Sequence, residues 1–288
     1  MLLAIDVGNT QTVLGLFEKG TAEPVQVWRV DTADAAARQQ IFLRPAPYRF
    51  GEPVVSPSLT SELTCCASGS RSNSTKGSGE IVACAAAPIE QAVVACVVPA
   101  LTEHWVTFAH ECGADEVLVV DATSVRDVLP IAIDAPDEVG ADRLANALAA
   151  RTCYGTPALV VDFGTATNID VVDTAGAYVG GVISPGLEAS ARALFAHAAR
   201  LAEVALVAPP HTVGNSTVTA VQSGLMFGEA AKVDGLIARI RDEIGVAETP
   251  VIATGGLAPR LAELCESIDH VDETLTLRGL ALIAEHTK

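Results

Sequence analysis

The feature that most constrains this chain is a pattern that occurs twice. Residues 2–14 form an apolar run that reaches an aspartate, then a glycine two positions later, a polar turn and a second apolar run. Residues 158–172 repeat this order, so that Asp6 and Asp162 lie about half of the 288-residue chain apart. An internal repeat constrains the fold more strongly than any single motif. We therefore predict an α/β protein of two duplicated domains, each opening with a three-stranded meander.

The repeated turn has the chemistry of a phosphate site. Gly8 allows the backbone to approach a ligand closely, and free N–H groups beside Asn9 and Thr10 form a cradle for an anion. Asp6 is unsuited to holding a phosphate directly, but it suits a metal ion that bridges phosphates. A single copy of these residues also fits an ordinary hairpin turn. Because the turn recurs at Asp162, we expect two facing turns that hold one nucleotide between them.

Strands and helices alternate along most of the sequence. Apolar periodicity predicts strands over 2–6, 11–17, 25–30, 92–98, 116–120, 158–172 as a hairpin, 177–182 and 250–253. It predicts helices over 102–111, 137–152, 187–204, 216–244, 258–266 and 277–286. Gly255 and Gly256 follow the last strand and precede a helix, which gives a flat backbone surface suited to a purine or a phosphate. We place the two domains at residues 1–150 and 151–288.

Several acids gather at the start of the helix predicted over 137–152. Helix capping explains Asp137 as the N-cap and Glu138 in the first turn. It does not explain Asp142, which Arg143 follows at once. A carboxylate can accept the proton of a hydroxyl nucleophile, and an arginine can bind a substrate carboxylate through two parallel hydrogen bonds. These residue types favour catalysis over capping for Asp142.

Composition excludes several classes of function. The net charge of −17 argues against a nucleic acid or an anionic membrane as partner. The chain has no long uncharged apolar run and no basic signal segment, so we expect a cytoplasmic protein. Seven cysteines without a CxxC pair indicate buried free thiols rather than disulfides or zinc. The sequence also lacks a P-loop, a protein-kinase signature and a Gly-x-Ser-x-Gly elbow.

Taken in order, the motifs resemble those of type III pantothenate kinase. The segments that carry the resemblance are 6–10, 138–143, 162–167, 180–186, 214–224 and 275–280. It extends over roughly residues 1–34 and 91–288. The resemblance implies duplicated actin-like (ribonuclease-H-like) domains with a nucleotide cleft between them. It further implies a homodimer that uses ATP to phosphorylate the primary hydroxyl of pantothenate, which is the first step of coenzyme A synthesis.

The resemblance also implies roles for individual residues. It makes Asp142 the general base and Asp162 the ligand of a monovalent cation, K⁺ or NH₄⁺, while Asp6 would reach Mg²⁺ through the phosphates. It implies ATP contacts by Asp6, Val7, Gly8, Asn9, Thr10, Gln11, Thr12, Val13 and Thr165. It implies pantothenate contacts by Gly140, Ala141, Asp142, Arg143 and, from the partner subunit, Thr217. Ile133 stands where family members often carry an aromatic residue, so packing against pantothenate is altered there.

Residues 35–90 depart from the resemblance. The segment 32–34 begins like an amphipathic helix, and then the sequence changes to proline, serine and cysteine without any period. Because so long a structureless stretch is unusual in a compact domain, we interpret it as a shifted reading frame, a divergent insertion or a disordered segment. Two other functions stay open. One is a non-catalytic relative with an accessory or regulatory role, and the other is a different kinase or phosphatase of the same fold.

Overall fold

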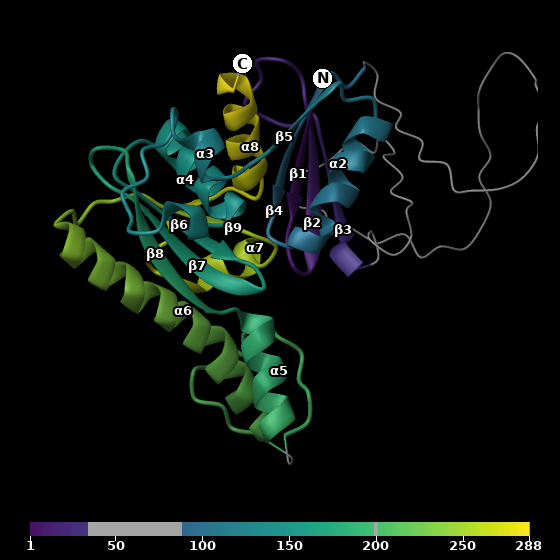
Figure 1. The fold of residues 1–288 in the computed structure, drawn as a ribbon. Coiled ribbons are helices and arrows are strands. Elements are labelled where there is room, and N and C mark those ends of the chain that lie inside the picture. Colours follow the sequence, from purple (N-terminus) through teal and green to yellow (C-terminus); the bar gives the residue numbers. More distant parts are fainter. Residues whose placement is uncertain (34–87, 199–200, 288) are drawn as a thin grey trace, which may run out of the picture.

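The computed structural model describes residues 1–33, 88–198 and 201–287 (Figure 1). The interpretation of residues 35–90 therefore falls almost entirely outside the described residues. Within the described ranges, no helix is both long and apolar enough to cross a membrane. The four cysteines described there are unpaired, as expected, but none is fully buried, and Cys153 is exposed.

Two five-stranded sheets confirm the predicted duplication. The first contains β1 (Leu2–Val7), β2 (Gln11–Phe17), β3 (Gln26–Asp31), β4 (Gln91–Cys96) and β5 (Glu116–Val119). The second contains β6 (Ala158–Phe163), β7 (Ala166–Val172), β8 (Tyr178–Pro185), β9 (Val251–Thr254) and β10 (His270–Val271). The strand orders are β3-β2-β1-β4-β5 and β10-β9-β6-β7-β8, which are the same order read from opposite edges. In both sheets the first strand pairs antiparallel with the second and parallel with the fourth.

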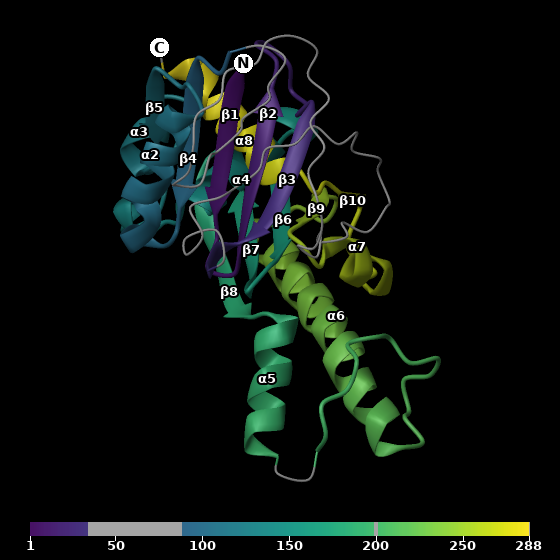
Figure 2. The same ribbon diagram turned by 90° about the vertical axis from the view of Figure 1, so that its right-hand side faces the viewer.

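Seven α-helices lie in the described part of the fold, together with short 3₁₀ helices at Pro99–Leu101, Pro136–Glu138 and Ala262–Leu264. The α-helices are α2 (Thr102–Glu111), α3 (Ala122–Val125), α4 (Ala141–Tyr154), α5 (Leu187–His197), α6 (Thr217–Ile244), α7 (Ala258–Leu261) and α8 (Leu275–His286). Helix α2 packs on β4 and β5, whereas α4 and α8 lie between the two sheets (Figures 1 and 2). The C-terminal half of the chain thus contributes to the N-terminal domain, because α8 packs on β1, β2 and β4 of the first sheet.

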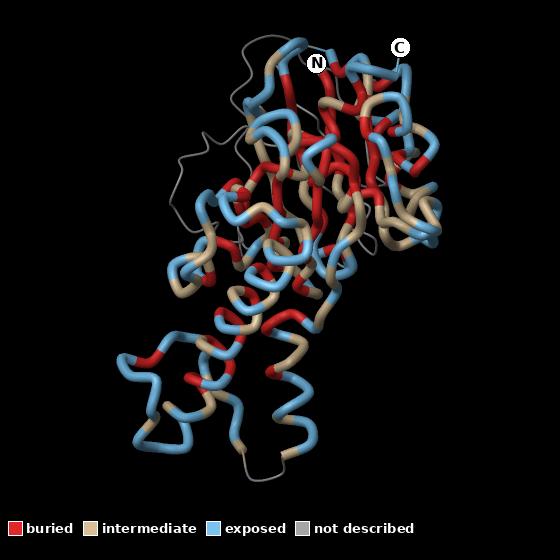
Figure 3. The backbone as a smooth tube through the Cα atoms, turned by 90° about the vertical axis from the view of Figure 1, so that its left-hand side faces the viewer, coloured by how far each residue is buried: buried red, intermediate tan, exposed pale blue. Residues whose placement is uncertain are grey.

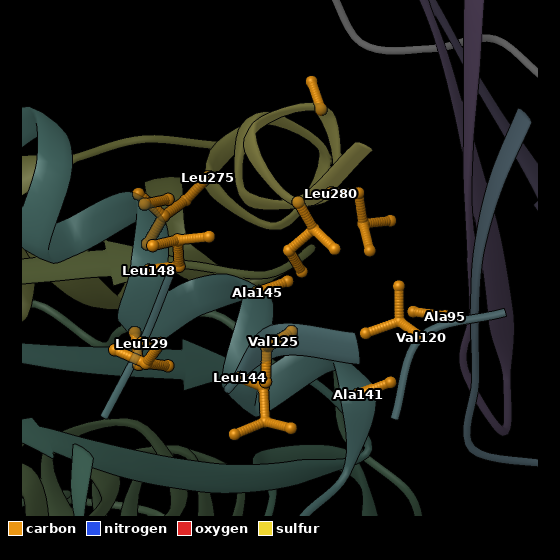
Figure 4. Packing of buried hydrophobic residues seen from close by; sticks show 14 of the residues in the cluster. Ala95, Val120, Val125, Leu129, Ala141, Leu144, Ala145, Leu148, Leu275 and Leu280 are labelled. Atoms are coloured by element: carbon orange, nitrogen blue, oxygen red, sulfur yellow. The ribbon is translucent and has the colours of Figure 1, made fainter. Parts of the chain in front are cut away.

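The contact between α4 and α8 forms the centre of the largest core. Leu144, Leu148, Leu275 and Leu280 meet there with alanines of α4 (Figure 4). The helices cross so closely that a Cβ on Gly279 would collide with the backbone of Ala145. Small residues at a helix crossing allow this approach, which fixes α4 rigidly against both sheets.

Helix α4 begins later than the sequence predicts. Gly140, not Asp137, is its N-cap, and residues 136–138 form a separate 3₁₀ turn. The extended backbone of Val139 separates the two, so the acids before it cannot cap α4. The predicted helix over 187–204 is also too long, since α5 ends at His197.

Helix α5 and the N-terminal half of α6 form an arm that extends away from the sheets, whereas the rest of α6 packs against the second sheet (Figures 1 and 2). The outer part of the arm is largely exposed, whereas the central strands β1, β4, β6 and β9 are largely buried (Figure 3). Ser216 caps the start of α6 by accepting a hydrogen bond from the backbone N–H of Thr219. Gly245, in a left-handed conformation, ends it.

Candidate active site

The two repeated turns meet directly. The Oγ1 atoms of Thr10 in the β1–β2 turn and Thr165 in the β6–β7 turn lie 2.9 Å apart in a hydrogen bond. In the first turn the N–H of Gly8 donates to the carbonyl of Gln11 at 3.0 Å. A Cβ on Gly8 would lie 2.8 Å from that same oxygen, so the turn requires glycine. The facing turns predicted from the repeat are therefore present.

Thr32, which was not predicted as a site residue, stabilises the first turn through hydrogen bonds. Its buried hydroxyl lies 2.8 Å from the carbonyl of Gly8 and 3.0 Å from Thr12 Oγ1. Its backbone N–H also donates to the carbonyl of Thr10 at 2.9 Å. Val7 and Thr12 are buried, whereas residues 9–11 are exposed. The turn thus presents Asn9, Thr10 and Gln11, while its strand residues hold the backbone in place.

Three carboxylates come together beneath the turns. Burial, followed by the charges of Asp142 and Asp162, raises the pKa of Asp6 well above its usual range. Burial and then the charge of Asp142 raise the pKa of Asp162 to about 6. Burial also raises the pKa of Asp142. Residues far apart in sequence thus form one acidic, poorly hydrated cluster, which a cation would stabilise.

Asp142 lies in the first turn of α4, and its local geometry fixes its direction. The backbone N–H of Arg143 donates to Asp142 Oδ1 at 2.9 Å. A Cβ on Gly140 would collide with the same Oδ1. Glycine at position 140 therefore leaves the space that the carboxylate occupies, which explains why this residue precedes the helix.

Asp162 lies at the end of β6 between the sheet and α4. Asn146 Nδ2 donates to Asp162 Oδ2 at 3.4 Å, and Thr276 Oγ1 donates to Asn146 Oδ1 at 2.8 Å. Gly255 has a φ of +90°, and a Cβ there would collide with Asp162 Oδ1 and lie 2.7 Å from the carbonyl of Phe163. The glycine after β9 thus allows close approach to the carboxylate.

The first turn also approaches the second glycine of that pair. A Cβ on Gly256 would lie 3.4 Å from Gln11 Oε1. The structure therefore brings together most of the residues expected to contact ATP: the first turn, Thr165, Gly255 and Gly256.

Arg143 binds partners that the sequence analysis did not identify. Its Nε donates to Asp170 Oδ1 at 2.7 Å, and its guanidinium carbon lies 5.8 Å from the ring centre of Tyr178. Tyr178 Oη donates to the same Asp170 oxygen at 3.1 Å. Asp170 is fully buried, and burial raises its pKa to about 7, although Arg143 opposes the shift. The sequence feature that could have identified Asp170 is its position as an acid within the apolar run of β7.

The two remaining expected contacts lie in different places. Ile133 is half-buried, with its Cγ2 atom 3.7 Å from the position of a Cβ on Gly180, a residue of β8. Arg143 Nη2 lies 3.0 Å from the corresponding position on Gly181, the next residue. Thr217 instead begins α6, in the arm. Within one chain, therefore, the fold does not group Thr217 with the acids.

The duplicated sheets, with the same strand order in each, define an actin-like α/β fold. A solved structure from Campylobacter jejuni, assigned to the Baf family of transcriptional activators, has a similar fold. It aligns with a TM-score of 0.53 and 19% identity and covers 98% of this chain and 97% of that one. At this identity the likeness shows the fold alone.

This chain belongs to the type III pantothenate kinase family. The model of that family matches residues 64–239. Type III pantothenate kinase from Acidothermus cellulolyticus is 40% identical over 286 residues, covering 99% of this chain and 98% of the relative. The enzyme of the same name from Thermomicrobium roseum is 41% identical over 280 residues, covering 97% and 95%.

Proposed function

We propose that this chain transfers the γ-phosphoryl group of ATP to the primary hydroxyl of pantothenate, forming 4'-phosphopantothenate in the first step of coenzyme A synthesis. The observation that carries the proposal is the acid cluster of Asp6, Asp142 and Asp162 at the facing turns, in a chain of this family. Phosphoryl transfer depends mainly on positioning and on neutralisation of charge. Acids beneath two phosphate cradles would position the reactants and bind the cations that neutralise the phosphate charge.

Asp142 is the proposed general base. A base is most effective when its pKa lies near the working pH. Burial raises the pKa of Asp142 in that direction while the Arg143 N–H keeps its carboxylate oriented. The carboxylate would align the substrate hydroxyl and accept its proton during in-line attack.

The donor set fits the cations that this reaction requires. Among the described residues, no group of three or more His, Cys, Asp or Glu side chains is placed to hold a metal ion alone. Mg²⁺ is usually bound by one or two carboxylates together with substrate phosphates, so Asp6 would share it with ATP. When bound, Mg²⁺ neutralises charge on the transferred group. Asp162 would bind the monovalent cation, K⁺ or NH₄⁺, which would relieve the repulsion from Asp142.

ATP would lie between the two turns. Asn9, Thr10 and Gln11 are exposed on the first turn and would donate to its phosphates. Thr165 would contact ATP from the second turn, beside its partner Thr10. The backbone at 255–256 would face the nucleotide, because Gly255 and Gly256 follow β9 beside Asp162 and Gln11 of the two turns.

The proposed homodimer would use the arm of α5 and α6. Val207, Val213 and Val218 are 49%, 86% and 50% exposed there. Large exposed apolar side chains in one segment would be covered if that segment formed an interface. A second copy seated on the arm would bring Thr217 toward the partner's pantothenate site. Light scattering should then give the mass of a dimer, and Val213→Glu should give a monomer. A monomeric wild-type protein would contradict the dimer.

An assay with purified protein tests the proposed reaction. ATP, Mg²⁺ and K⁺ are supplied with pantothenate, a sugar or polyphosphate, and the phosphorylated product is identified by mass. We expect turnover on pantothenate that falls when K⁺ is replaced by a bulky cation such as tetramethylammonium. Well-folded protein that binds ATP but does not phosphorylate pantothenate would contradict the proposal. Turnover on a sugar alone would identify another kinase of the same fold.

A further inference from the structure

Half of the unpaired buried polar atoms found in the described residues lie in one corner of the site. Six buried side-chain nitrogen or oxygen atoms lack a hydrogen-bond partner there, and three of them are Arg143 Nη2, Asn168 Oδ1 and Asp170 Oδ2. Buried polar groups are normally paired, so a cluster of exceptions requires an explanation. Asn168 and Asp170 are two residues apart on β7, and alternate residues of a strand project from the same face. This corner is therefore incomplete without further atoms.

The guanidinium of Arg143 is held on one edge and one face. Asp170 accepts from its Nε, and the Tyr178 ring lies against it at 5.8 Å. Tyr178 in turn fixes Asp170, because its hydroxyl donates to the same oxygen. A Cβ on Gly181 would lie 3.0 Å from Nη2, so glycine at this position leaves room for the guanidinium beside β8. These contacts fix the plane of the guanidinium, and among its nitrogens Nη2 is buried without a hydrogen-bond partner.

We propose that Asp170, steadied by Tyr178, is a positioning residue that fixes the guanidinium of Arg143, whose side chain is 14% exposed, so that it binds the carboxylate of the acceptor substrate. This inference rests on the proposed function, because pantothenate supplies the carboxylate. Asp170 itself does not touch the substrate. A guanidinium with a fixed plane loses less conformational freedom when it binds a carboxylate than a mobile one does.

A purely structural ion pair is the alternative, and the same strand offers a comparison. On β7, Thr167 Oγ1 donates to Glu229 Oε1 at 2.7 Å, and Lys232 donates to Glu229 Oε2 at 2.8 Å. Among the buried atoms described, none of the unpaired ones belongs to these three residues. The network at Glu229 is thus complete, whereas the network at Asp170 is open. Glu229, a buried acid of α6 that is hydrogen-bonded to the same strand, is therefore the matched control.

The test compares pantothenate with its neutral N-methyl amide at saturating ATP. Hydrogen bonds to charged groups contribute about 1.5–3 kcal/mol, which corresponds to a factor of about 10–100. We expect Asp170→Ala to raise the KM for pantothenate by about that factor, with kcat and the KM for ATP within about threefold of wild type. The KM for the amide should change far less, because it lacks the carboxylate. Asp170→Asn retains an acceptor oxygen and should lie between wild type and Asp170→Ala.

Two further variants keep the inference testable if Asp170→Ala does not fold. Tyr178→Phe removes only the hydroxyl and should raise the KM for pantothenate a few-fold, again sparing the amide. Glu229→Ala should lower the melting temperature without changing the ratio of the two substrates. An unchanged ratio in the Asp170 and Tyr178 variants, while wild type phosphorylates pantothenate, would overturn the positioning role alone. Wild-type protein without turnover on pantothenate would instead contradict the proposed function.

Discussion

Replacing Gly140 by alanine should impair catalysis without touching any ionisable group. The added Cβ would collide with Asp142 Oδ1 and lie 3.6 Å from its Cγ. Val97 Cγ1, at 3.8 Å, limits movement of the methyl group on another side. The carboxylate must therefore rotate, which also breaks its hydrogen bond from the Arg143 N–H. Since Asp142 is the proposed base, its direction determines how well the substrate hydroxyl is aligned.

The expected loss follows from the size of this displacement. A shift of roughly 1 Å in a reacting group can lower the rate by about 10²-fold, which is about 2.7 kcal/mol in the activation free energy. The effect on folding should be smaller, because glycine and alanine at an N-cap differ by about 1 kcal/mol or less. For a chain of this size that lowers the melting temperature by about 2–4 °C.

Steady-state kinetics and thermal unfolding separate these effects. We expect Gly140→Ala to lower kcat by about 10²-fold while ATP binding, measured by calorimetry, stays within about twofold. Gly235→Ala is the matched control, because a Cβ there meets no atom within 4 Å and the position lies inside α6. Its activity should be unchanged, and its stability equal or slightly higher. A Gly140→Ala variant with wild-type kcat would refute the argument that Gly140 fixes the direction of Asp142.

Three further predictions concern the cradle and the cation site. Burial raises the pKa of Asp162 to about 6, so the folded apo protein binds a proton at this residue more tightly than the unfolded chain does. The free energy of unfolding should therefore rise as the pH falls from about 6 toward 4. In urea unfolding at several pH values, Asp162→Asn should reduce this pH dependence of the free energy of unfolding by up to about 1.4 kcal/mol per pH unit. The same pH dependence in the variant and in wild type would contradict the raised pKa of Asp162. Thr10→Val and Thr165→Val should each raise the KM for ATP, and the double variant should do little more. A coupling energy near zero, rather than about 0.5–1.5 kcal/mol, would show that their hydrogen bond is unimportant. Gly255→Ala, at a φ of +90°, should lower the free energy of unfolding by about 1–3 kcal/mol, and unchanged stability and ATP binding would contradict its assigned role.

The duplication could be predicted from the sequence because it is written in local patterns. Period-two apolar runs and the recurring aspartate and glycine locate the two hairpins, and the strand orders confirm them. Asp6, Asp142 and Asp162 could be selected because their residue types are unusual in their local setting. Their common location requires the fold, since the chain brings them together from three separate elements.

The supporting residues could not be predicted, because they depend on tertiary register. The side chain of Arg143 on α4 donates a hydrogen bond to Asp170 on β7. Neither sequence segment alone predicts this pairing. The same limit explains the wrong N-cap. Local preference favours Asp137, whereas glycine occupies position 140 because the Asp142 carboxylate fills the space of a Cβ.

The interpretation of residues 35–90 stays a prediction. The alignment to the Acidothermus cellulolyticus relative covers 99% of this chain and therefore spans the segment. Sequencing the coding DNA tests the frame-shift interpretation directly. Compensating frame changes near codons 35 and 90 would support this interpretation, and a coding sequence without such changes would contradict it.

The most direct test of the central claim is the turnover of Asp142→Asn on pantothenate with ATP, Mg²⁺ and K⁺. The substitution keeps the shape of the side chain and removes its ability to accept the hydroxyl proton. We predict that kcat falls by about 10²–10⁴-fold while the Kd for ATP stays within about twofold of wild type. A variant that folds, binds ATP and retains more than about a tenth of wild-type kcat would contradict the assignment of Asp142 as the general base.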